Sequence, residues 1–472
     1  MKNIKPHYWL LIGIVLITLT HTRASIGVLA FLEPIPFLLY LEQRRSKSAL
    51  LWIFLCLLLG WTLATAKIVT APIPWFIAPA YALPIASFKI LAFLLFIPLR
   101  ERQLAGYLFP AAFTLAEWLQ ATLTPFATWG IMAYTQVENI VWMQITSLGG
   151  IWILSFVIYL IAYQLFIALK TGQSNWNPKL LIFTVLLVSI FGSVRLSLAE
   201  SQNNEMITVA AIGTNSEIGM GAFPDLSKRS ANRALIYQRM NKATSAGAEL
   251  VVWTEAATGV LPDEEAAFQA EVTQLVDSLN VAAIVSYVVP TQFDPLLYLN
   301  KFIAIDSTGS IVHTYLKHEP VPGEPAIKGI QPHRSFQLNG MLLGGAICYD
   351  YDFPRLALNI ARLGVDIVAL PSSDWRGIDP VHTQMARFRA VEGGYSLIRS
   401  TRWGLSATVN PVGRFTGWSS DNDLGDKLVI AQVPREGKRT IYCRLGDWLP
   451  IVSAVLILIQ AITLLRMRTF NR

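Results

Sequence analysis

Long apolar runs dominate the first 200 residues of the chain, and shorter alternating runs follow them. A helix needs about 20 mostly apolar residues to cross a hydrocarbon core of about 30 Å. The stretches that meet or approach this length are 8–20, 25–41, 49–66, 75–98, 104–123, 145–169, 180–198 and 449–465. The pattern predicts about seven spanning helices in 1–200, a water-exposed domain over 201–445, and a last spanning helix with a short tail in 446–472.

The first two apolar stretches depart from a simple spanning pattern. Basic residues flank 8–20, which is also typical of a signal peptide. No small-residue cleavage site is clear after it and further spans follow, so we expect a retained first helix. Pro34 and Pro36 interrupt the second stretch.

The distribution of basic residues predicts the orientation of these helices, because short cytoplasmic loops carry an excess of Lys and Arg. With eight helices, the opposite short loops hold only Arg23 and Lys67. The residues that fall on one side are Lys2, Lys5, Arg44, Arg45, Lys47, Arg100, Arg102, Lys170, Lys179, Arg466, Arg468 and Arg472. We therefore expect both termini in the cytoplasm and the large domain outside, in the periplasm of a double-membrane bacterium. One miscounted helix would invert the domain.

Residues 201–445 have the pattern of an α/β domain, because buried strand-like runs alternate with helical stretches. The expected strands are 207–212, 249–253, 281–289, 302–305, 341–347, 366–370, 396–400 and 405–409. The expected helices include 226–246, 262–279, 354–363 and 381–393. Asp306-Ser-Thr-Gly309 is typical of a turn between antiparallel strands.

The composition fits this division. Hydrophobic residues make up 53% of the 472 positions and charged residues 15%, against about 25% charged in soluble domains. This excludes a disordered chain and a purely soluble enzyme. The net charge of +7 is explained by the loop positions of the basic residues, so we expect no nucleic-acid partner. Three cysteines are too few for a disulfide framework.

Familiar catalytic motifs are missing from the sequence. There is no G-x-S-x-G, P-loop or H-E-x-x-H motif, and the six histidines show no pair at ligand spacing. We interpret the histidines as surface or structural residues. No metal or organic cofactor is expected.

Three polar residues follow or end apolar strands: Glu255, Lys317 and Cys348. Such strand ends are where α/β sheets place ligands. An ammonium favours the nucleophilic thiolate, and a carboxylate can take the thiol proton and return it to a leaving group. The ammonium can also help to hold an oxyanion. Three plainer interpretations remain open: a buried packing cysteine, a structural Glu255–Lys317 ion pair, and a Cys348–Cys443 disulfide.

At these residues the sequence resembles the nitrilase, or carbon–nitrogen hydrolase, superfamily. Ala346-Ile-Cys-Tyr-Asp-Tyr-Asp-Phe-Pro354 resembles its nucleophile motif, and Asp366-Ile-Val-Ala-Leu-Pro-Ser-Ser-Asp-Trp375 resembles the segment after it. The resemblance covers about 207–435. It implies an α-β-β-α four-layer sandwich with Glu255, Lys317 and Cys348 as the catalytic set.

A narrower resemblance, to the apolipoprotein N-acyltransferase family, covers nearly the whole chain. Its segments are 116–119, 129–130, 134–136, 384–390, 399–401 and 440–448. It implies a multi-pass inner-membrane enzyme that moves an acyl chain from phospholipid to the α-amino group of a lipoprotein's diacylglyceryl-cysteine. Cys348 would form the thioester, Glu255 would act as general base and acid, and Lys317 would support the oxyanion. We expect a monomer.

Other positions match that family less fully. Glu324 resembles a second glutamate that orients the lysine, Tyr349 a tyrosine beside the nucleophile, and Asp350 stands where the family usually has glutamate. The interval from Lys317 to Cys348 lacks a longer insertion usual in the family. It leaves open a divergent member, or a membrane-anchored amidase that passes the acyl group to water. From another class, a non-catalytic sensor or binding module is a third possibility.

Two charged residues fall within predicted spans, where such residues are functional candidates. For Lys89 we expect a position near a helix end, with the ammonium reaching the interface. For Glu117 a functional and a structural role are equally open.

Overall fold

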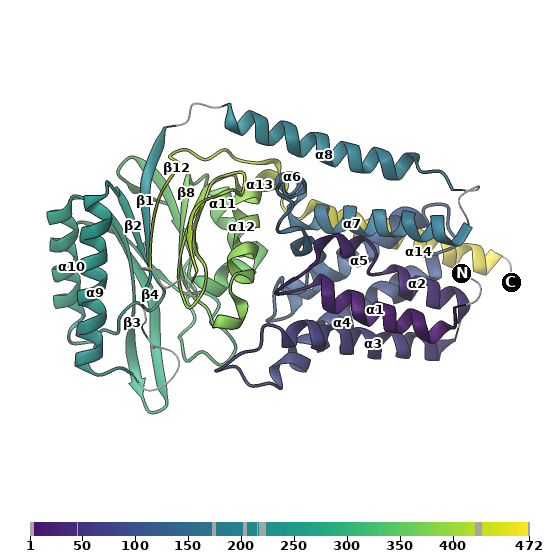
Figure 1. Ribbon diagram of the computed structural model, residues 1–472, viewed down its shortest axis with the longest axis horizontal. Coiled ribbons are helices and arrows are strands. Elements are labelled where there is room, and N and C mark those ends of the chain that lie inside the picture. Colours follow the sequence, from purple (N-terminus) through teal and green to yellow (C-terminus); the bar gives the residue numbers. More distant parts are fainter. Residues whose placement is uncertain are drawn as a thin grey trace. The chain divides into compact units, whose positions relative to one another are not determined.

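The computed structural model describes residues 4–44, 46–171, 176–201, 205–214, 216, 223–420 and 427–470. The chain forms two compact units (Figure 1). The first, here called the helical unit, comprises Met1–Glu200 and Leu445–Arg472, and the second, the sandwich unit, comprises Ser201–Arg444. Three residues used above to predict orientation, Lys2, Arg45 and Arg472, lie outside the described residues.

Helices occur at every apolar stretch expected in the helical unit. They are α1 (Pro6–Thr20), α2 (Ile35–Gln43), α3 (Lys47–Ala66), α4 (Ile77–Phe96), α5 (Ala105–Leu123), α7 (Thr146–Thr171), α8 (Lys179–Glu200) and α14 (Trp448–Phe470). Shorter elements are η1 (Gly27–Phe31), η2 (Ile97–Leu99), η3 (Met132–Gln136) and α6 (Ile140–Met143).

Length and composition separate these helices. Within the described ranges, five are long and apolar enough to cross a membrane: Ser48–Ala66, Ile77–Leu99, Thr146–Thr171, Lys179–Glu200 and Trp448–Met467. The second expected stretch is divided into η1 and the nine-residue α2, with Pro34 directly before α2. Eight crossings therefore stay a prediction.

The sandwich unit contains two mixed six-stranded sheets. The first has the order β12-β1-β2-β3-β4-β5, in which β1, β2 and β3 are parallel. The second has the order β11-β10-β9-β8-β7-β6, in which β7, β8 and β9 are parallel. The first sheet's strands are β1 (Met206–Ile212), β2 (Leu250–Trp253), β3 (Ala282–Phe293), β4 (Leu296–Ile305), β5 (Ile311–Leu316) and β12 (Leu428–Pro434). The second sheet's are β6 (Phe336–Leu338), β7 (Met341–Gly345), β8 (Ile367–Ser373), β9 (Ser396–Arg402), β10 (Ser406–Val409) and β11 (Phe415–Ser419).

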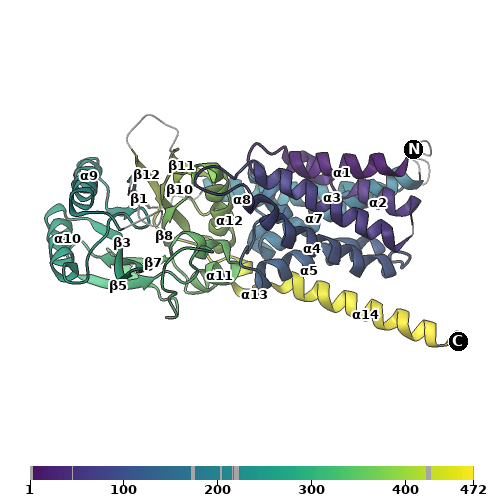
Figure 2. The ribbon, with the colours of Figure 1, turned by 90° about the horizontal axis from the view of Figure 1, so that it is seen from below.

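Helices cover the outer face of each sheet. In Figures 1 and 2, α9 (Leu226–Ser245) and α10 (Glu265–Leu279) lie beside the first sheet, and α11 (Pro354–Arg362) and α12 (Val381–Gly393) beside the second. The remaining helical elements of this unit include η5 (Cys348–Asp352), η6 (Arg376–Ile378) and α13 (Ile441–Leu445). The layers follow the α-β-β-α order expected from the sequence.

Alternation along the strands explains these layers, since successive side chains point to opposite faces of a sheet. In β1, Ile207, Val209 and Ala211 belong to the core between the sheets. Ala210 and Ile212 belong to the core under α9 and α10. Both faces of the sheet are buried, so its strands read as nearly continuous apolar runs.

Candidate active site

The three residues singled out from the sequence all follow strands of the sandwich unit. Glu255 comes after β2 and Lys317 directly after β5, both in the first sheet. Cys348 follows β7 of the second sheet and begins η5. All three are buried, with exposed fractions of 3%, 1% and 3%. The two sheets therefore each supply part of one buried group of reactive side chains.

Lys317 binds two carboxylates. Its Nζ donates to Glu255 Oε1 at 2.7 Å and to Glu324 Oε2 at 2.7 Å. Burial alone would lower the pKa of Lys317, but the charges of Glu255 and Glu324 outweigh burial and raise that pKa well above its ordinary value. The lysine is therefore a permanent ammonium, and the two carboxylates exceed it by one negative charge.

Asn300 on β4 joins the two glutamates. Its Nδ2 donates to Glu255 Oε1 at 2.7 Å and to Glu324 Oε1 at 2.9 Å. Burial would raise the pKa of Glu324, but Lys317 and the donors around it, including the Val321 N–H at 2.9 Å, hold that pKa below its ordinary value. Glu324 thus stays ionised beside the lysine. Sequence reasoning missed Asn300 because it lies within a strand and belongs to no motif.

Cys348 is held in an unusual backbone conformation. Its φ of +47° lies in the left-handed region, which costs about 1–2 kcal/mol for a residue with a side chain. Such strain is found where the surrounding structure fixes a functional side chain. Sγ lies 3.4 Å from the Ser373 carbonyl oxygen. Burial and the negative charge of Glu255 raise the pKa of the thiol well above its ordinary value, although Lys317 opposes them. The resting cysteine is a thiol, so a base must remove its proton.

Asp350 fastens the segments that carry Lys317 and Cys348. Its Oδ2 accepts the Ile347 N–H at 3.0 Å and the Tyr315 hydroxyl at 2.8 Å, and its Oδ1 accepts the backbone N–H groups of His318 and Glu319. Burial raises the pKa of Asp350 to about 6. This carboxylate is enclosed by donors from both sides of the site.

Tyr349 is also buried, and its ring packs edge-on against Phe353 with centroids 5.4 Å apart.

A second charged cluster lies beside Cys348, and sequence reasoning missed it. Asp352, Asp374, His382 and Arg399, here called the His382 cluster, are all at most 4% exposed. His382 Nε2 lies 2.9 Å from Asp352 Oδ1, and Nδ1 lies 2.7 Å from Asp374 Oδ1. Arg399 binds both oxygens of Asp374, at 2.9 and 3.1 Å. A signal was available, because Asp352, Asp374 and Arg399 lie in the segments that carry the family resemblance. His382 lies outside those segments, in the first turn of α12.

Cys348, Asp374 and His382 together carry the atom types that bind zinc, since one ligand atom from each lies within 4.8 Å of the others. A metal needs a free lone pair on the imidazole. Both ring nitrogens of His382 instead have carboxylate partners, and Arg399 adds a positive charge. The arrangement fits an ion-pair network better than a metal centre.

Cys348 and Cys443 are both free, so no disulfide joins them. Cys443 is buried and its Sγ lies 3.5 Å from the Glu392 carbonyl oxygen.

In the helical unit, Lys89 on α4 and Glu117 on α5 form a buried ion pair at 2.5 Å, and Tyr159 on α7 donates to the same carboxylate oxygen at 2.7 Å. Met132 N–H also donates to it, at 3.1 Å. The expectation that Lys89 reaches an interface is wrong, because it is only 3% exposed. A carboxylate on the neighbouring helix satisfies its charge inside the unit.

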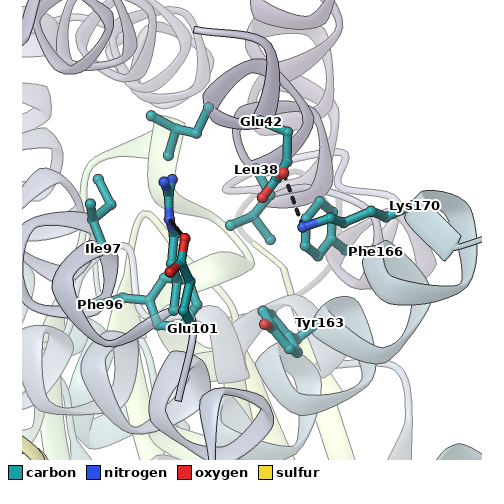
Figure 3. Close-up of a pocket in the computed structure, with 10 residues that line it drawn as sticks. Leu38, Glu42, Phe96, Ile97, Glu101, Tyr163, Phe166 and Lys170 are labelled. Atoms are coloured by element: carbon teal, nitrogen blue, oxygen red, sulfur yellow. Dashed lines mark ion pairs between the residues drawn. The ribbon is translucent and has the colours of Figure 1, made fainter. Parts of the chain in front are cut away.

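A separate cavity in the helical unit lies among α2, α4, η2 and α7 (Figure 3). Its walls include Leu38, Phe96 and Phe166, and an ion pair of 2.9 Å joins Lys170 to Glu42 at its edge. Its lining contains no cysteine or serine nucleophile, so it offers no second site of the same chemistry.

Each of the two units contains a segment that is similar to a known protein family. Residues 208–441 match the model of the carbon–nitrogen hydrolase family, and residues 14–164 match that of the apolipoprotein N-acyltransferase N-terminal domain. The chain is 27% identical over 398 residues to the apolipoprotein N-acyltransferase of Rhodopseudomonas palustris, covering 75% of this chain and 72% of that protein. It is 26% identical over 403 residues to that of Bradyrhizobium diazoefficiens, covering 77% and 73%. A carbon–nitrogen hydrolase from Helicobacter pylori has a TM-score of 0.41 at 18% identity, covering 48% of this chain and 89% of that one.

Proposed function

Because the chain belongs to the apolipoprotein N-acyltransferase family, we propose that it acylates lipoproteins through a thioester on Cys348. The acyl donor is a phospholipid, and the acceptor is the α-amino group of the lipid-modified N-terminal cysteine of a lipoprotein. The observation that carries the chemical part is the buried Lys317 ammonium bound to Glu255 and Glu324 in one group with a thiol.

In the first half-reaction Glu255 takes the Cys348 proton and the thiolate attacks the ester carbonyl of the phospholipid. The oxyanion that forms is stabilised by the Lys317 ammonium, which has no solvent to compete with it. When the intermediate collapses, the carbon–oxygen ester bond breaks. Glu255 then returns its proton to the leaving alkoxide, and a lysophospholipid departs.

In the second half-reaction the lipoprotein amine attacks the thioester carbonyl. Glu255 removes a proton from the attacking nitrogen, the carbon–sulfur bond breaks, and the amide leaves with the acyl chain. The thiolate recovers the proton from Glu255, which restores the resting enzyme. A thioester suits this order because an amine displaces a thiolate more readily than an alkoxide.

The supporting residues act through the three reacting groups. Glu324 keeps Lys317 charged and oriented while Glu255 exchanges protons, and Asn300 fixes the spacing of the two carboxylates. Asp350 holds the Cys348 turn against the segment after Lys317. Tyr349 shapes the site beside the nucleophile.

The same proposal includes the placement of the chain. The sandwich unit lies on the outer side of the bacterial inner membrane, both termini are cytoplasmic, and the enzyme acts as a monomer. The excess of basic residues in alternate loops supports this orientation. Topology reporters test the two parts of this proposal separately. A fusion at residue 200 reports the side of the sandwich unit, and one at the C-terminal end reports the side of that terminus.

The test is mass spectrometry of the purified protein in detergent, incubated with phospholipid and then with a diacylglyceryl lipopeptide. We expect an acyl mass on the Cys348 peptide that hydroxylamine removes and that moves to the lipopeptide amine. An N-acetylated lipopeptide should leave it in place. Cys348→Ser should give no thioester, whereas Cys443→Ser should behave like the parent. Release only as free fatty acid would identify a hydrolase, and an adduct on another residue would overturn the role of Cys348.

A further inference from the structure

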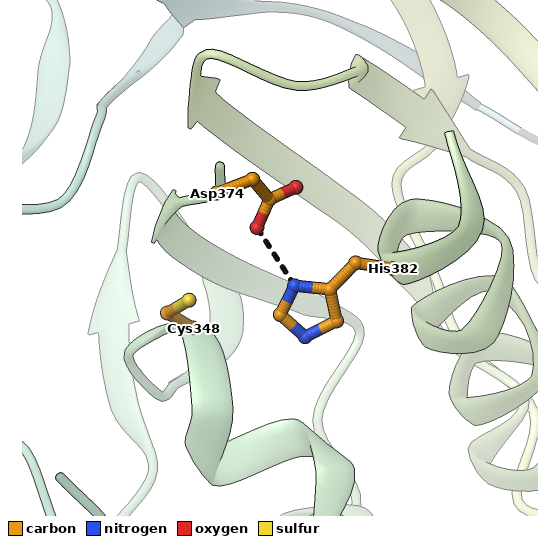
Figure 4. Close-up of side chains that lie close together, drawn as sticks. All are labelled: Cys348, Asp374 and His382. Carbon is orange, nitrogen blue, oxygen red and sulfur yellow. Dashed lines mark hydrogen bonds and ion pairs between the residues drawn. The ribbon is translucent and has the colours of Figure 1, made fainter. Parts of the chain in front are cut away.

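The nucleophile has charged neighbours that the acyl-transfer steps above do not use. Figure 4 shows Cys348 beside the Asp374–His382 pair, and atoms of these three side chains lie within 4.8 Å of one another. Burial leaves the His382 cluster without water to screen its charges. Any net charge on this cluster therefore acts strongly on the Cys348 sulfur.

The two carboxylates that face His382 favour its protonated form. A neutral imidazole donates from only one ring nitrogen and would point the lone pair of the other at a carboxylate oxygen. Here Nδ1 faces Asp374 at 2.7 Å and Nε2 faces Asp352 at 2.9 Å, and only an imidazolium donates to both carboxylates. Arg399 Nη2 lies 2.9 Å from Nδ1 and donates to the same Asp374 oxygen. A neutral ring could accept from Arg399 at Nδ1, but its lone pair would then also face the Asp374 oxygen, which disfavours that form. Burial would lower the pKa of His382, but Asp352 and Asp374 outweigh it and raise that pKa to about 9.

With His382 protonated, the cluster is neutral: Asp352 and Asp374 balance His382 and Arg399. Without that proton it carries one negative charge next to the thiol. Glu255 and Asp374 already oppose ionisation of Cys348, while Lys317 and Arg399 favour it. An uncompensated carboxylate would shift this balance further against the thiolate.

We infer that His382 is a positioning residue for the nucleophile, whose positive charge keeps the cluster behind Cys348 neutral so that the thiol can give up its proton at physiological pH. The inference rests on the proposed role of Cys348 in acyl transfer. It gives His382 no contact with either substrate and no part in the proton exchange of Glu255.

Alkylation of Cys348 by iodoacetamide tests this electrostatic role without any lipid, because only the thiolate reacts. The rate is followed against pH on the full-length protein in detergent, by mass spectrometry of the Cys348 peptide. We expect His382→Gln to move the midpoint of the profile upward by about one pH unit or more, and to slow alkylation at pH 7 by about tenfold. Asp352→Asn should move the midpoint downward.

The double variant His382→Gln/Asp352→Asn separates charge from packing, because it removes one charge of each sign. We expect its midpoint to return close to that of the parent. Arg389→Gln is the matched control: it removes another buried cation from α12, one that pairs with Glu392. It should lower thermal stability without moving the midpoint.

The inference is overturned if His382→Gln keeps the parent profile, or if the double variant stays as slow as His382→Gln. Should His382→Gln fail to fold, an unshifted profile in Asp352→Asn would overturn it equally. If the proposed function is wrong but the role of His382 is right, no acyl-enzyme forms from phospholipid, while the alkylation shifts still appear.

Discussion

Two buried lysines, one in each unit of the molecule, solve the same physical problem with different numbers of carboxylates. Lys89 in the helical unit is paired with Glu117 and receives support from the Tyr159 hydroxyl. Lys317 in the sandwich unit is paired with both Glu255 and Glu324. Both lysines are at most 3% exposed, so neither can be satisfied by water.

On the proposed mechanism, the difference in charge balance separates a pair that takes part in the reaction from one that joins helices. Lys89 and Glu117 cancel, and their contacts join α4, α5 and α7. At Lys317 one carboxylate is in excess, and a buried thiol lies in the same group. An excess carboxylate beside a permanent cation is a proton acceptor held in place, which the neutral pair of the helical unit does not provide.

Neutralising Glu255 and Glu117 in turn should affect the two units in different ways. We expect Glu255→Gln to slow formation of the acyl-enzyme by roughly 10²–10⁴-fold, because the thiol loses its base. Glu117→Gln should leave that rate per folded molecule nearly unchanged and lower the unfolding temperature instead. Acyl-enzyme mass after short incubations measures the first effect, and thermal unfolding in detergent the second. Equal loss of acylation in both variants would show that the two pairs are functionally alike.

The helical pair can be tested as a unit. Lys89→Met leaves the Glu117 charge buried without its partner and should cost about 3–5 kcal/mol of stability. Adding Glu117→Leu to that variant removes the stranded charge, and we expect much of the loss to be recovered. Thermal unfolding of both variants decides this. A double variant less stable than Lys89→Met would contradict a purely structural role.

Alkaline pH should affect the sandwich unit through His382. Its folded pKa of about 9 lies above the usual value near 6.5. The stability it contributes is therefore fully present below about pH 6.5 and lost as pH rises through about 9, a change of up to about 3 kcal/mol. Unfolding temperatures between pH 6 and 10 should fall more steeply for the parent than for His382→Gln. Parallel curves would refute the assignment of this charge.

The two lysine sites can be made alike in charge by neutralising one of the carboxylates at Lys317. Glu324→Gln leaves Lys317 with one carboxylate, as Lys89 has. Because Lys317 then loses one of the two carboxylates that orient it, we expect about a tenfold slower acylation. Acyl-enzyme mass after short incubations measures this rate. A rate unchanged from the parent would remove Glu324 from the site.

The sequence allowed most of the sandwich unit to be predicted, because the central strands of both sheets are buried on both faces and read as apolar runs. Edge elements were harder: β6 has three residues and β11 alternates in burial, so neither stands out. Glu255, Lys317 and Cys348 could be found because each interrupts an apolar run at a strand end.

Residues that complete the site gave weaker signals. Asn300 lies inside β4, and the His382 cluster is assembled from the end of η5, the residue after β8, the neighbouring strand β9 and the start of α12. Spacing along the chain does not show which of these residues become neighbours in the folded structure. Lys89 was misjudged for the same reason: whether a buried charge finds a partner depends on which helices are neighbours, and apolar periodicity does not encode that.

The last helix has a consequence for how the protein is made. Both oxygens of Asp447, just before α14, accept indole N–H groups, from Trp118 on α5 at 2.9 Å and from Trp152 on α7 at 2.7 Å. Ribosomes add these residues only after the whole sandwich unit. During synthesis, the indole N–H groups of Trp118 and Trp152 therefore lack this acceptor until Asp447 has been added. A chain that stopped before Asp447 would leave both indole N–H groups without this acceptor, so completion of the helical unit depends on full translation of the sandwich unit.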